Sequence, residues 1–279
     1  DLPPAAKLEL GQVRMSTPSK DPTGALAAFA ASLRYDDLPA DVVAMVKRVV
    51  LDTLGVSLAA TTLGPGCRQV VSVMRDLGGA SESTILCHAP KVAAPHAAFA
   101  NGALAHALNF DPIGTDVGHI GVVCLAAPLA AAEAAGGVSG RTFLASCAVA
   151  CEVTARITAA LAKLHRLSDG NILAGQMFGY FGAAAGAGRA LGLKAAAIRD
   201  TLGLALMQSA GSMQMVFDGD PPAKAIYGAF PNQAGVLAAL LSRAGLGADC
   251  DAVAGPAGIF GLFHGGTFDA KALTGGLGT

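Results

Sequence analysis

The sequence predicts an all-α fold. Nearly every long segment repeats its apolar residues with the 3.6-residue period of a helix, and alternating β-branched runs are scarce. Gly-containing breaks separate these segments, as expected of helices joined by short loops. Because 53% of the 279 residues are hydrophobic and only 14% are charged, the chain has ample material for one large helical core.

The helices are placed by their caps, their apolar faces and the breaks between them. Thr23 is the expected N-cap of the first helix, and Pro39 suits the start of the second. Residues 83–87 form the one extended piece that we expect, so the prediction allows at most one strand pair. The expected helices cover residues 24–34, a long stretch from Pro39, and 65–77, 92–108, 121–135, 140–164, 173–191, 195–210 and 231–245.

A single domain follows from this series of helices. Residues 15–266 are predicted to form the all-α domain. Residues 1–14 are predicted to be a disordered or expression-derived tail, and the Gly-rich residues 267–279 a C-terminal tail. In the second helix, the residues expected to face inward are Val42, Val43, Val46, Val49, Val50 and Leu54.

Composition argues against several classes of protein. The longest uncharged apolar stretch, 120–132, is too short to span a bilayer, and the net charge of −1 with no Lys/Arg block gives no support for nucleic-acid binding. No secretory signal is visible at residues 1–14, so a cytoplasmic location is expected. The six cysteines form no CxxC motif, and Cys147 and Cys151, one helical turn apart, are predicted to be small core residues.

Polar groups gather in one stretch, residues 96–119. They crowd the exit of an apolar helix, where burying them without partners would be unfavourable, so a pocket for a polar ligand is expected there. No metal or phosphate motif accompanies them, and the Gly-rich segment 186–192 lacks the preceding strand of a dinucleotide loop. We therefore predict no metal site and no cofactor. The polar residues of this stretch include Asn101, His106, Asn109, Asp111, Asp116 and His119.

This stretch also resembles a known family. The run Asn101–Asp111, followed by His119-Ile120-Gly121, looks like the signature of the MmgE/PrpD family, which includes 2-methylcitrate dehydratase, cis-aconitate decarboxylase and iminodisuccinate epimerase. The segments Leu51–Gly55 and Phe181–Ala185 resemble the early and central helices of that family. The segment around Ala223-Lys224 and 235–241 resembles its lysine segment, and the order of all these motifs is specific.

The resemblance implies roles for individual residues. His119 precedes an apolar helix whose dipole favours a neutral imidazole, which could accept a proton as a catalytic base. Lys224, which could also be a solvated surface lysine, would bind a substrate carboxylate and share in catalysis. Asp111 is the third implied catalytic residue, although it could simply cap a helix or orient His119. Asn109, Asn101 and His106 are candidate substrate-binding residues, the last two with a structural alternative.

Three departures from the family pattern stand out. Asn109 stands where the family often has Asp, and Leu173 falls where the family commonly has His before its central helix. A carboxamide cannot act as a base, so both changes remove groups that the standard dehydration or decarboxylation would use. Family members also continue into an α+β lid domain, which the resemblance predicts to be absent from this chain.

The sequence therefore predicts a lyase of MmgE/PrpD type, a dehydratase or decarboxylase acting on a small di- or tricarboxylate by proton transfer alpha to a carboxylate. One alternative is an isomerase or epimerase of a small dicarboxylate. Another is a helical subunit of a split enzyme, or a binding protein, with little activity alone. The expected partners are the carboxylate substrate and either a second copy of the chain or a lid-bearing chain, with no nucleic acid and no membrane.

Overall fold

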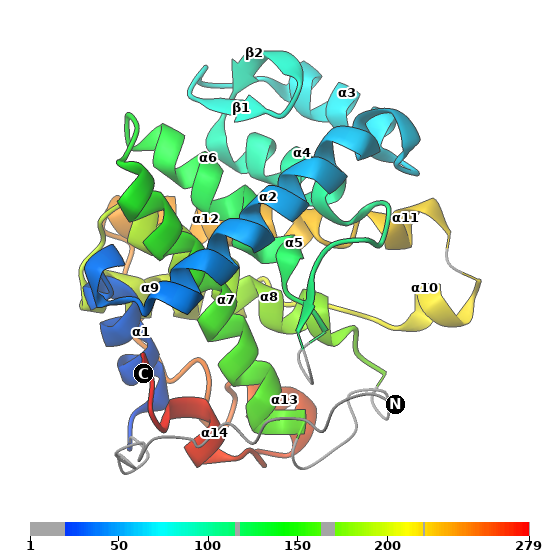
Figure 1. Ribbon diagram of the computed structural model, residues 1–279. Helices are drawn as coiled ribbons and strands as arrows, with labels where there is room; N and C mark the ends of the chain where they lie inside the picture. The colour runs from blue at the N-terminus through cyan, green and yellow to red at the C-terminus, as the bar shows by residue number, and fades with distance from the viewer. Residues whose placement is uncertain (1–19, 115–117, 163–170, 220, 279) are drawn as a thin grey trace, which may run out of the picture.

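A computed structural model describes residues 20–114, 118–162, 171–219 and 221–278 (Figure 1). Helices dominate these ranges, and the only sheets in them are two short hairpins, so the predicted all-α class is confirmed. The helices are α1 (Pro22–Ser32), α2 (Ala40–Leu63), α3 (Cys67–Leu77), α4 (Ala94–His106), α5 (Gly121–Cys124), α6 (Ala126–Ala134), α7 (Gly140–Ala162), α8 (Ala174–Ala190), α9 (Ala195–Leu206), α10 (Gln214–Phe217), α11 (Pro222–Ala225), α12 (Ala229–Arg243), α13 (Ile259–His264) and α14 (Ala270–Thr274), with a 3-10 turn at Tyr35–Asp37.

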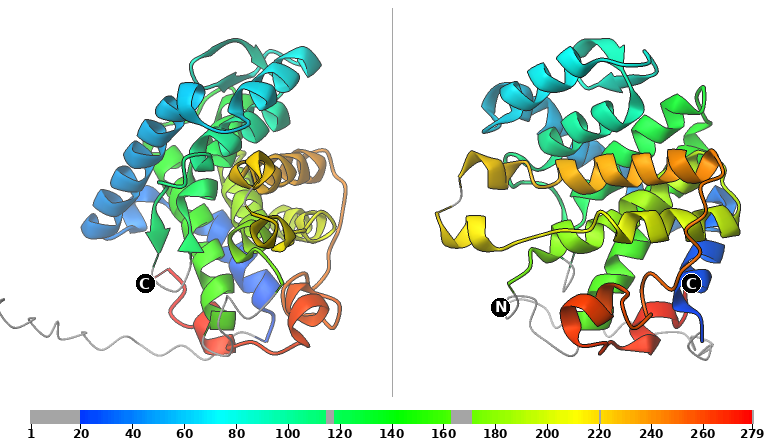
Figure 2. Two further views of the ribbon diagram at one scale, coloured as in Figure 1. Left: turned by 90° about the vertical axis from the view of Figure 1, so that its right-hand side faces the viewer. Right: turned by 180° about the vertical axis from the view of Figure 1, so that it is seen from behind.

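Helix α8 forms the centre of the core, where it packs against both α7 and α12 (Figure 2). Its Phe178 and Phe181 side chains are completely buried. Small residues let the helices approach closely, since a Cβ on Gly182 would lie 1.9 Å from Thr154 Oγ1 of α7. Gly186 lies inside α8, so the interpretation of this Gly-rich segment as helix packing is confirmed.

Most helices begin and end within a few residues of their expected bounds. The predicted helix 121–135 is wrong in one respect, because it breaks at Leu125 into α5 and α6. Pro128 lies in the first turn of α6, where a missing N–H leaves no helical hydrogen bond unmade. The predicted helix 195–210 ends earlier than expected, at Leu206.

The first helix has a different cap from the one predicted. The Asp21 carboxylate accepts the Gly24 N–H at 2.9 Å, which makes Asp21 the N-cap of α1. The Thr23 hydroxyl instead donates to Asp251 at 2.6 Å and thereby ties α1 to a distant loop. The expectation that Thr23 caps this helix is therefore wrong.

The strands form two hairpins where the sequence predicted at most one pair. The expected extended piece is β1 (Ser83–Ile85), which pairs with β2 (His88–Val92), so α4 begins at Ala94 rather than at 92. The second pair, β3 (Ile113–Gly114) and β4 (Gly118–His119), was not predicted. Strands of two residues are too short to show a period in sequence.

Helix α2 crosses the front of the molecule in Figure 1, and it buries a narrower face than predicted. Of the six residues expected to face inward, only Val46 is buried, and Val42 is 38% exposed. The helix instead buries Thr53, Ser57 and Ala60. Apolar residues surround much of α2, so the hydrophobic pattern could not identify the face that packs.

The predicted C-terminal tail, 267–279, contains helix α14, whose Leu273 is buried. The Arg156 guanidinium of α7 donates to the carbonyl oxygens of Ala272, Gly275 and Gly276. Among the described residues this segment is therefore packed on the helical core. The predicted tail 1–14 lies outside the described residues.

Helix α7 contains both the membrane-length apolar stretch of the described residues and the cysteine pair Cys147 and Cys151. The stretch Gly140–Leu161 is long and apolar enough to cross a membrane, but 67% of its most apolar window is buried inside the protein, as is typical of a core helix. Cys147 is completely buried and Cys151 is half-buried, and both are free thiols. These two cysteines are therefore packing residues, as predicted.

Candidate active site

Helix α4 delivers His106 to the site at its last residue. The chain then turns sharply, with the Asn109 N–H donating to the His106 carbonyl at 2.7 Å and Asn109 in the left-handed region at φ 57°. Asn tolerates this conformation better than most residues, which gives a local reason for its presence. The turn leaves the Asn109 side chain exposed and places Asp111 beside the helix end.

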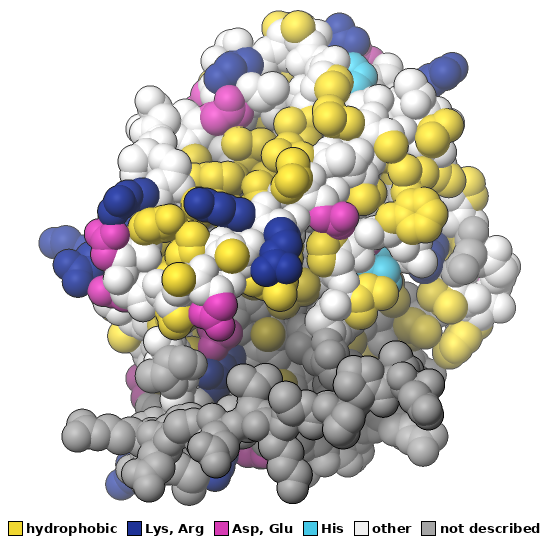
Figure 3. Space-filling view, in the orientation of Figure 1, with side chains coloured by type: hydrophobic (Ala, Val, Ile, Leu, Met, Phe, Trp, Pro, Cys, Tyr) yellow, Lys and Arg dark blue, Asp and Glu magenta, His cyan; other side chains and the backbone are white. Residues whose placement is uncertain are grey.

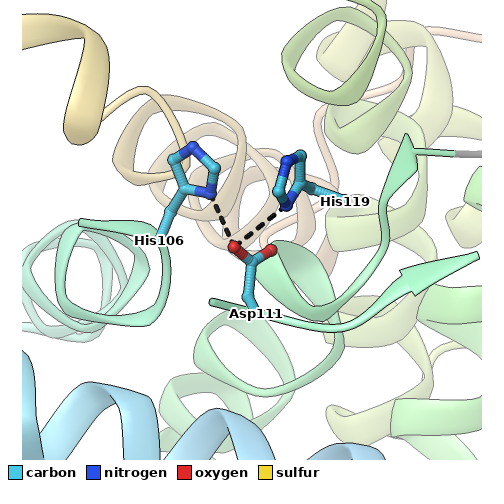
Figure 4. A group of neighbouring side chains, drawn as sticks. All are labelled: His106, Asp111 and His119. Carbon is cyan, nitrogen blue, oxygen red and sulfur yellow. Dashed lines mark hydrogen bonds and ion pairs between the residues drawn. The ribbon is translucent and has the colours of Figure 1, made fainter. Parts of the chain in front are cut away.

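Asp111 joins two histidines in what we call the His106–Asp111–His119 cluster (Figure 4). Its Oδ1 lies 2.8 Å from His106 Nδ1 and 3.1 Å from His119 Nδ1. The β3–β4 hairpin brings His119 back toward Asp111, because Ile113 pairs with His119. The two imidazole rings meet edge to face at 4.8 Å.

The shared carboxylate determines the tautomers of both rings. An ionised carboxylate can only accept hydrogen bonds, so both Nδ1 atoms must carry a proton. Each neutral ring then has an unprotonated Nε2. The His106 side chain is 1% exposed and that of His119 is 22% exposed, so of the two only His119 can readily meet a ligand.

Burial and hydrogen bonding shift the pKa values of Asp111 and His106 in opposite directions. Burial alone would raise the pKa of the Asp111 carboxyl, but the hydrogen bonds from His106 and His119 outweigh it and hold the pKa below its ordinary value. Burial lowers the pKa of His106, and the attraction of Asp111 only partly offsets this. The cluster is therefore an anionic Asp111 beside a neutral His106.

A close crossing of α4 and the start of α12 lies beside His106. A Cβ on Gly102 of α4 would lie 2.6 Å from the carbonyl oxygen of Gly228, so the two backbones touch. The buried Asn232 carboxamide fixes this crossing by donating to the carbonyls of Val122 and Gly228 and accepting the Ala127 N–H. Sequence reasoning missed Asn232, although an Asn inside an apolar helix is itself a signal.

The crossing sets Tyr227 and Lys224 beside His106. The buried Tyr227 ring lies 4.1 Å from the His106 ring, and burial raises the pKa of its phenol. Lys224 of α11 is half-buried, and its ammonium makes no hydrogen bond or ion pair with another described residue. It lines a pocket of about 340 Å³ together with His106 and Asn109; the other lining residues are Pro65, Ala107, Pro221, Pro222 and Ala225.

The sequence matches the family model MmgE/PrpD N-terminal domain over residues 24–271. The chain belongs to the MmgE/PrpD family. As an MmgE/PrpD domain it is 29% identical over 237 residues to the cis-aconitate decarboxylase-like protein oryM of Aspergillus oryzae, a match that covers 82% of this chain and 48% of that protein. It is 26% identical over 228 residues to cis-aconitate decarboxylase of Aspergillus terreus, a match that covers 80% of this chain and 46% of that protein. The chain thus spans about half the length of these relatives.

The MmgE/PrpD domain distributes the predicted site residues over three places. His106, Asp111 and His119 form the cluster, and Lys224 and Asn109 line the adjoining pocket with His106. Asn101 instead holds the β1–β2 hairpin. Its Oδ1 accepts the Leu86 N–H at 2.9 Å, and its Nδ2 donates to the Thr84 carbonyl at 2.9 Å. Leu173, at the place where a family histidine was expected, is the N-cap of α8 and packs against the core.

The cluster also has the residue types of a metal site, which the sequence did not predict. Its three ligand atoms all lie within 4.8 Å of one another. A tetrahedral zinc ion with ligands at about 2.0 Å holds them roughly 3.3 Å apart. The separations of 2.8 and 3.1 Å are instead those of hydrogen bonds, so the arrangement fits a shared carboxylate better than a cation.

The neutral state of His106 makes the stability of the MmgE/PrpD domain depend on pH. Its pKa lies below the ordinary value of 6.5, so the unfolded chain binds more protons as the pH falls below about 6.5. The free energy of unfolding should therefore fall on acidification, by up to about 1.4 kcal/mol per pH unit. Urea unfolding at pH 7.5, 6.5 and 5.5 measures this dependence.

The matched variant is His106→Asn, whose amide can still donate to Asp111 but does not titrate. This variant should be less stable overall, because it loses the ring that packs on Tyr227, yet its stability should change less between pH 7.5 and 5.5. An equal pH dependence in the parent and the variant would show that His106 is not the group responsible.

Proposed function

We propose that this chain is the helical part of a lyase that acts on a small di- or tricarboxylate by proton transfer alpha to a carboxylate. The observation that carries the proposal is the cluster itself, in which Asp111 orients His119 while Lys224 lines the adjoining pocket together with His106. A base and a cation near one another are what a carboxylate substrate with an acidic alpha proton requires.

Lys224 supplies the carboxylate-binding group in this proposal. Its ammonium makes no ion pair with another described residue, and partial burial strengthens its attraction for an anion. Asn109, which lines the same pocket, can donate a hydrogen bond from its amide to a second carboxylate oxygen. A substrate with two or three carboxylates could therefore be held at one end and react at the other.

His119 moves the proton. In a dehydration, its unprotonated Nε2 removes the alpha proton as the hydroxide leaves the neighbouring carbon. In a decarboxylation, the C–C bond breaks, carbon dioxide leaves, and the electron pair that stays on the substrate carbon takes a proton from the same ring in its imidazolium form. Asp111 stabilises that imidazolium through Nδ1, so the same arrangement of the two residues suits both reactions. The names of the two relatives, a cis-aconitate decarboxylase-like protein and a cis-aconitate decarboxylase, support the second reaction.

A further domain that covers the site is also part of the proposal. His119 is partly open to solvent, and the relatives are about twice as long as this chain. A closed site would strengthen each electrostatic contribution, so we propose that a further domain, on this or another chain, covers the site in the cytoplasm. The alternative of a helical binding subunit with little activity alone follows from the same two observations.

The test is incubation of the purified chain with di- and tricarboxylates, cis-aconitate among them, in D₂O. Proton NMR should show alpha-proton exchange or the product that has lost carbon dioxide or water. Calorimetry of the same acids measures binding separately. Binding without exchange would favour the binding-subunit alternative, and neither binding nor exchange with any acid would contradict both.

The pH dependence of the rate distinguishes the two reactions. A rate that rises with pH indicates His119 acting as a base, as dehydration requires. A rate that falls with pH indicates the imidazolium acting as an acid, as decarboxylation requires.

A further inference from the structure

Helix α8 begins with two backbone N–H groups that lack acceptors. Leu173 is the N-cap of this helix, and no side chain caps it. The Leu173 carbonyl accepts the N–H groups of Gln176 and Met177 at 3.0 and 2.9 Å. The N–H groups of Ala174 and Gly175, in contrast, make no hydrogen bond with another described residue. Free N–H groups at the positive end of a helix dipole attract an anion.

The hydroxyl of Tyr227 lies beside this helix end. Tyr227 is 2% exposed, yet its hydroxyl makes no hydrogen bond with another described residue. A Cβ added to Gly175 would lie 3.0 Å from the hydroxyl oxygen. Because Cα–Cβ bonds tilt toward the N-terminus of a helix, the hydroxyl lies on the side to which the free N–H groups point. A buried donor without a partner is unfavourable, which points to a ligand that accepts from it.

Gly175 keeps the space between the helix and the hydroxyl open. Its φ is not positive, so the backbone conformation does not require a glycine there. Alanine would favour the helix, but its Cβ would press on the Tyr227 hydroxyl. Burial raises the pKa of the Tyr227 phenol, so the hydroxyl keeps its proton and remains a donor.

This helix end adjoins the His106–Asp111–His119 cluster. The His106 ring contacts the Tyr227 ring at 4.1 Å and the His119 ring at 4.8 Å, and strand β4, which carries His119, lies against α8. One small acid can therefore reach both His119 and the start of α8. The His119 side chain is 22% exposed, and Figure 3 shows a histidine at the surface among hydrophobic side chains, on the side where α5 and α11 lie.

We propose that the N–H groups of Ala174 and Gly175 and the hydroxyl of Tyr227 form an oxyanion site, which binds the substrate carboxylate next to the reacting carbon. This inference rests on the proposed function and adds to it. When His119 Nε2 takes the alpha proton, the electron pair of the broken C–H bond moves into that carboxylate, and return of a proton to the carbon reverses the step. Donors fixed where this charge develops stabilise it more than they stabilise the substrate. Lys224, in the adjoining pocket, binds the other carboxylate.

Two matched acids test the oxyanion site. Succinate has two carboxylates, and 3-nitropropionate carries a nitro group in place of one of them. Its deprotonated form, a nitronate, has the same net charge as succinate but resembles a carboxylate that has already received the electron pair. Calorimetry of the parent chain should show that the nitronate, freshly prepared in base, binds at least about tenfold more tightly than succinate.

Three variants locate this preference. Tyr227→Phe removes only the hydroxyl and should lower the preference about tenfold, because a hydrogen bond to a charged oxygen is lost. Its melting temperature should stay at or above that of the parent, since the hydroxyl is unpaired in the free chain. Gly175→Ala places a Cβ in front of the hydroxyl and should also lower the preference while keeping its helical circular dichroism. Tyr35→Phe, in the 3-10 turn, is the matched control and should keep the parent preference.

The outcomes separate the oxyanion site from the proposed function. Lys224→Ala should weaken both acids alike and keep the preference, because the lysine binds the carboxylate that they share. A parent that binds succinate without preferring the nitronate, or a Tyr227→Phe variant that keeps the preference, would overturn the oxyanion site alone. A parent that binds neither acid would contradict the proposed function and the oxyanion site together.

Discussion

Replacing His119 with alanine should lower the kcat for a carboxylate substrate by about 10²- to 10⁴-fold while leaving its KM nearly unchanged. This is the range that a positioned proton-transfer group contributes. The reason lies in the cluster, where His119 is the only one of the two rings with a solvent-accessible side chain. The measurement is steady-state kinetics with a substrate that the parent turns over.

Two further variants show whether the lost group is the base. His119→Asn can still donate to Asp111 in place of Nδ1, but it cannot accept a proton, so it should be as slow as the alanine variant. His88→Ala, on β2 outside the cluster, should keep the parent rate. Full activity in His119→Asn would assign the proton transfer to another residue.

Replacing Lys224 with alanine should raise the KM for di- and tricarboxylates by about ten- to a hundred-fold with a smaller change in kcat. A hydrogen bond to a charged group contributes about 1.5–3 kcal/mol, and each 1.4 kcal/mol is a factor of ten in affinity. The open side of the pocket favours the lower end of that range, since water screens the ammonium. Calorimetric titration with a tricarboxylate measures the same loss without turnover.

Lys224→Arg and Lys194→Ala are the comparison variants. The arginine keeps the positive charge and should recover most of the binding, whereas the exposed Lys194 at the start of α9 should be dispensable. If Lys224→Ala lowered kcat alone, the lysine would act on the reacting atoms rather than on a remote carboxylate.

The sequence predicted the long helices well because the helical period extends over more than ten residues in each of them. It failed where the signal was short or ambiguous. The β3–β4 hairpin pairs only two residues on each strand, and the apolar residues of α2 surround too much of the helix to reveal its inner face. Both failures concern surfaces that only packing against neighbouring elements decides.

The crowding of polar residues at 96–119 located the candidate site in the sequence, and the resemblance to the family assigned the roles of its residues. Nothing in the spacing of His106, Asp111 and His119 shows that one carboxylate oxygen accepts from both rings, because an unpredicted hairpin brings the third residue back. Asn101 illustrates the reverse case. It was a candidate for binding substrate, yet both ends of its carboxamide hold backbone groups of a neighbouring hairpin.

The backbone contact between Gly102 and Gly228 limits which substitutions can change the size of the neighbouring pocket. Two main chains that already touch leave no side chain to enlarge or trim, so neither helix can shift without breaking the crossing that Asn232 fixes. The opposite wall is built from Pro65, Pro221 and Pro222, which lie outside the long helices. Changes in the size of the accepted acid, by natural drift or by design, are therefore expected at lining positions outside the long helices, such as Pro65 and Pro221.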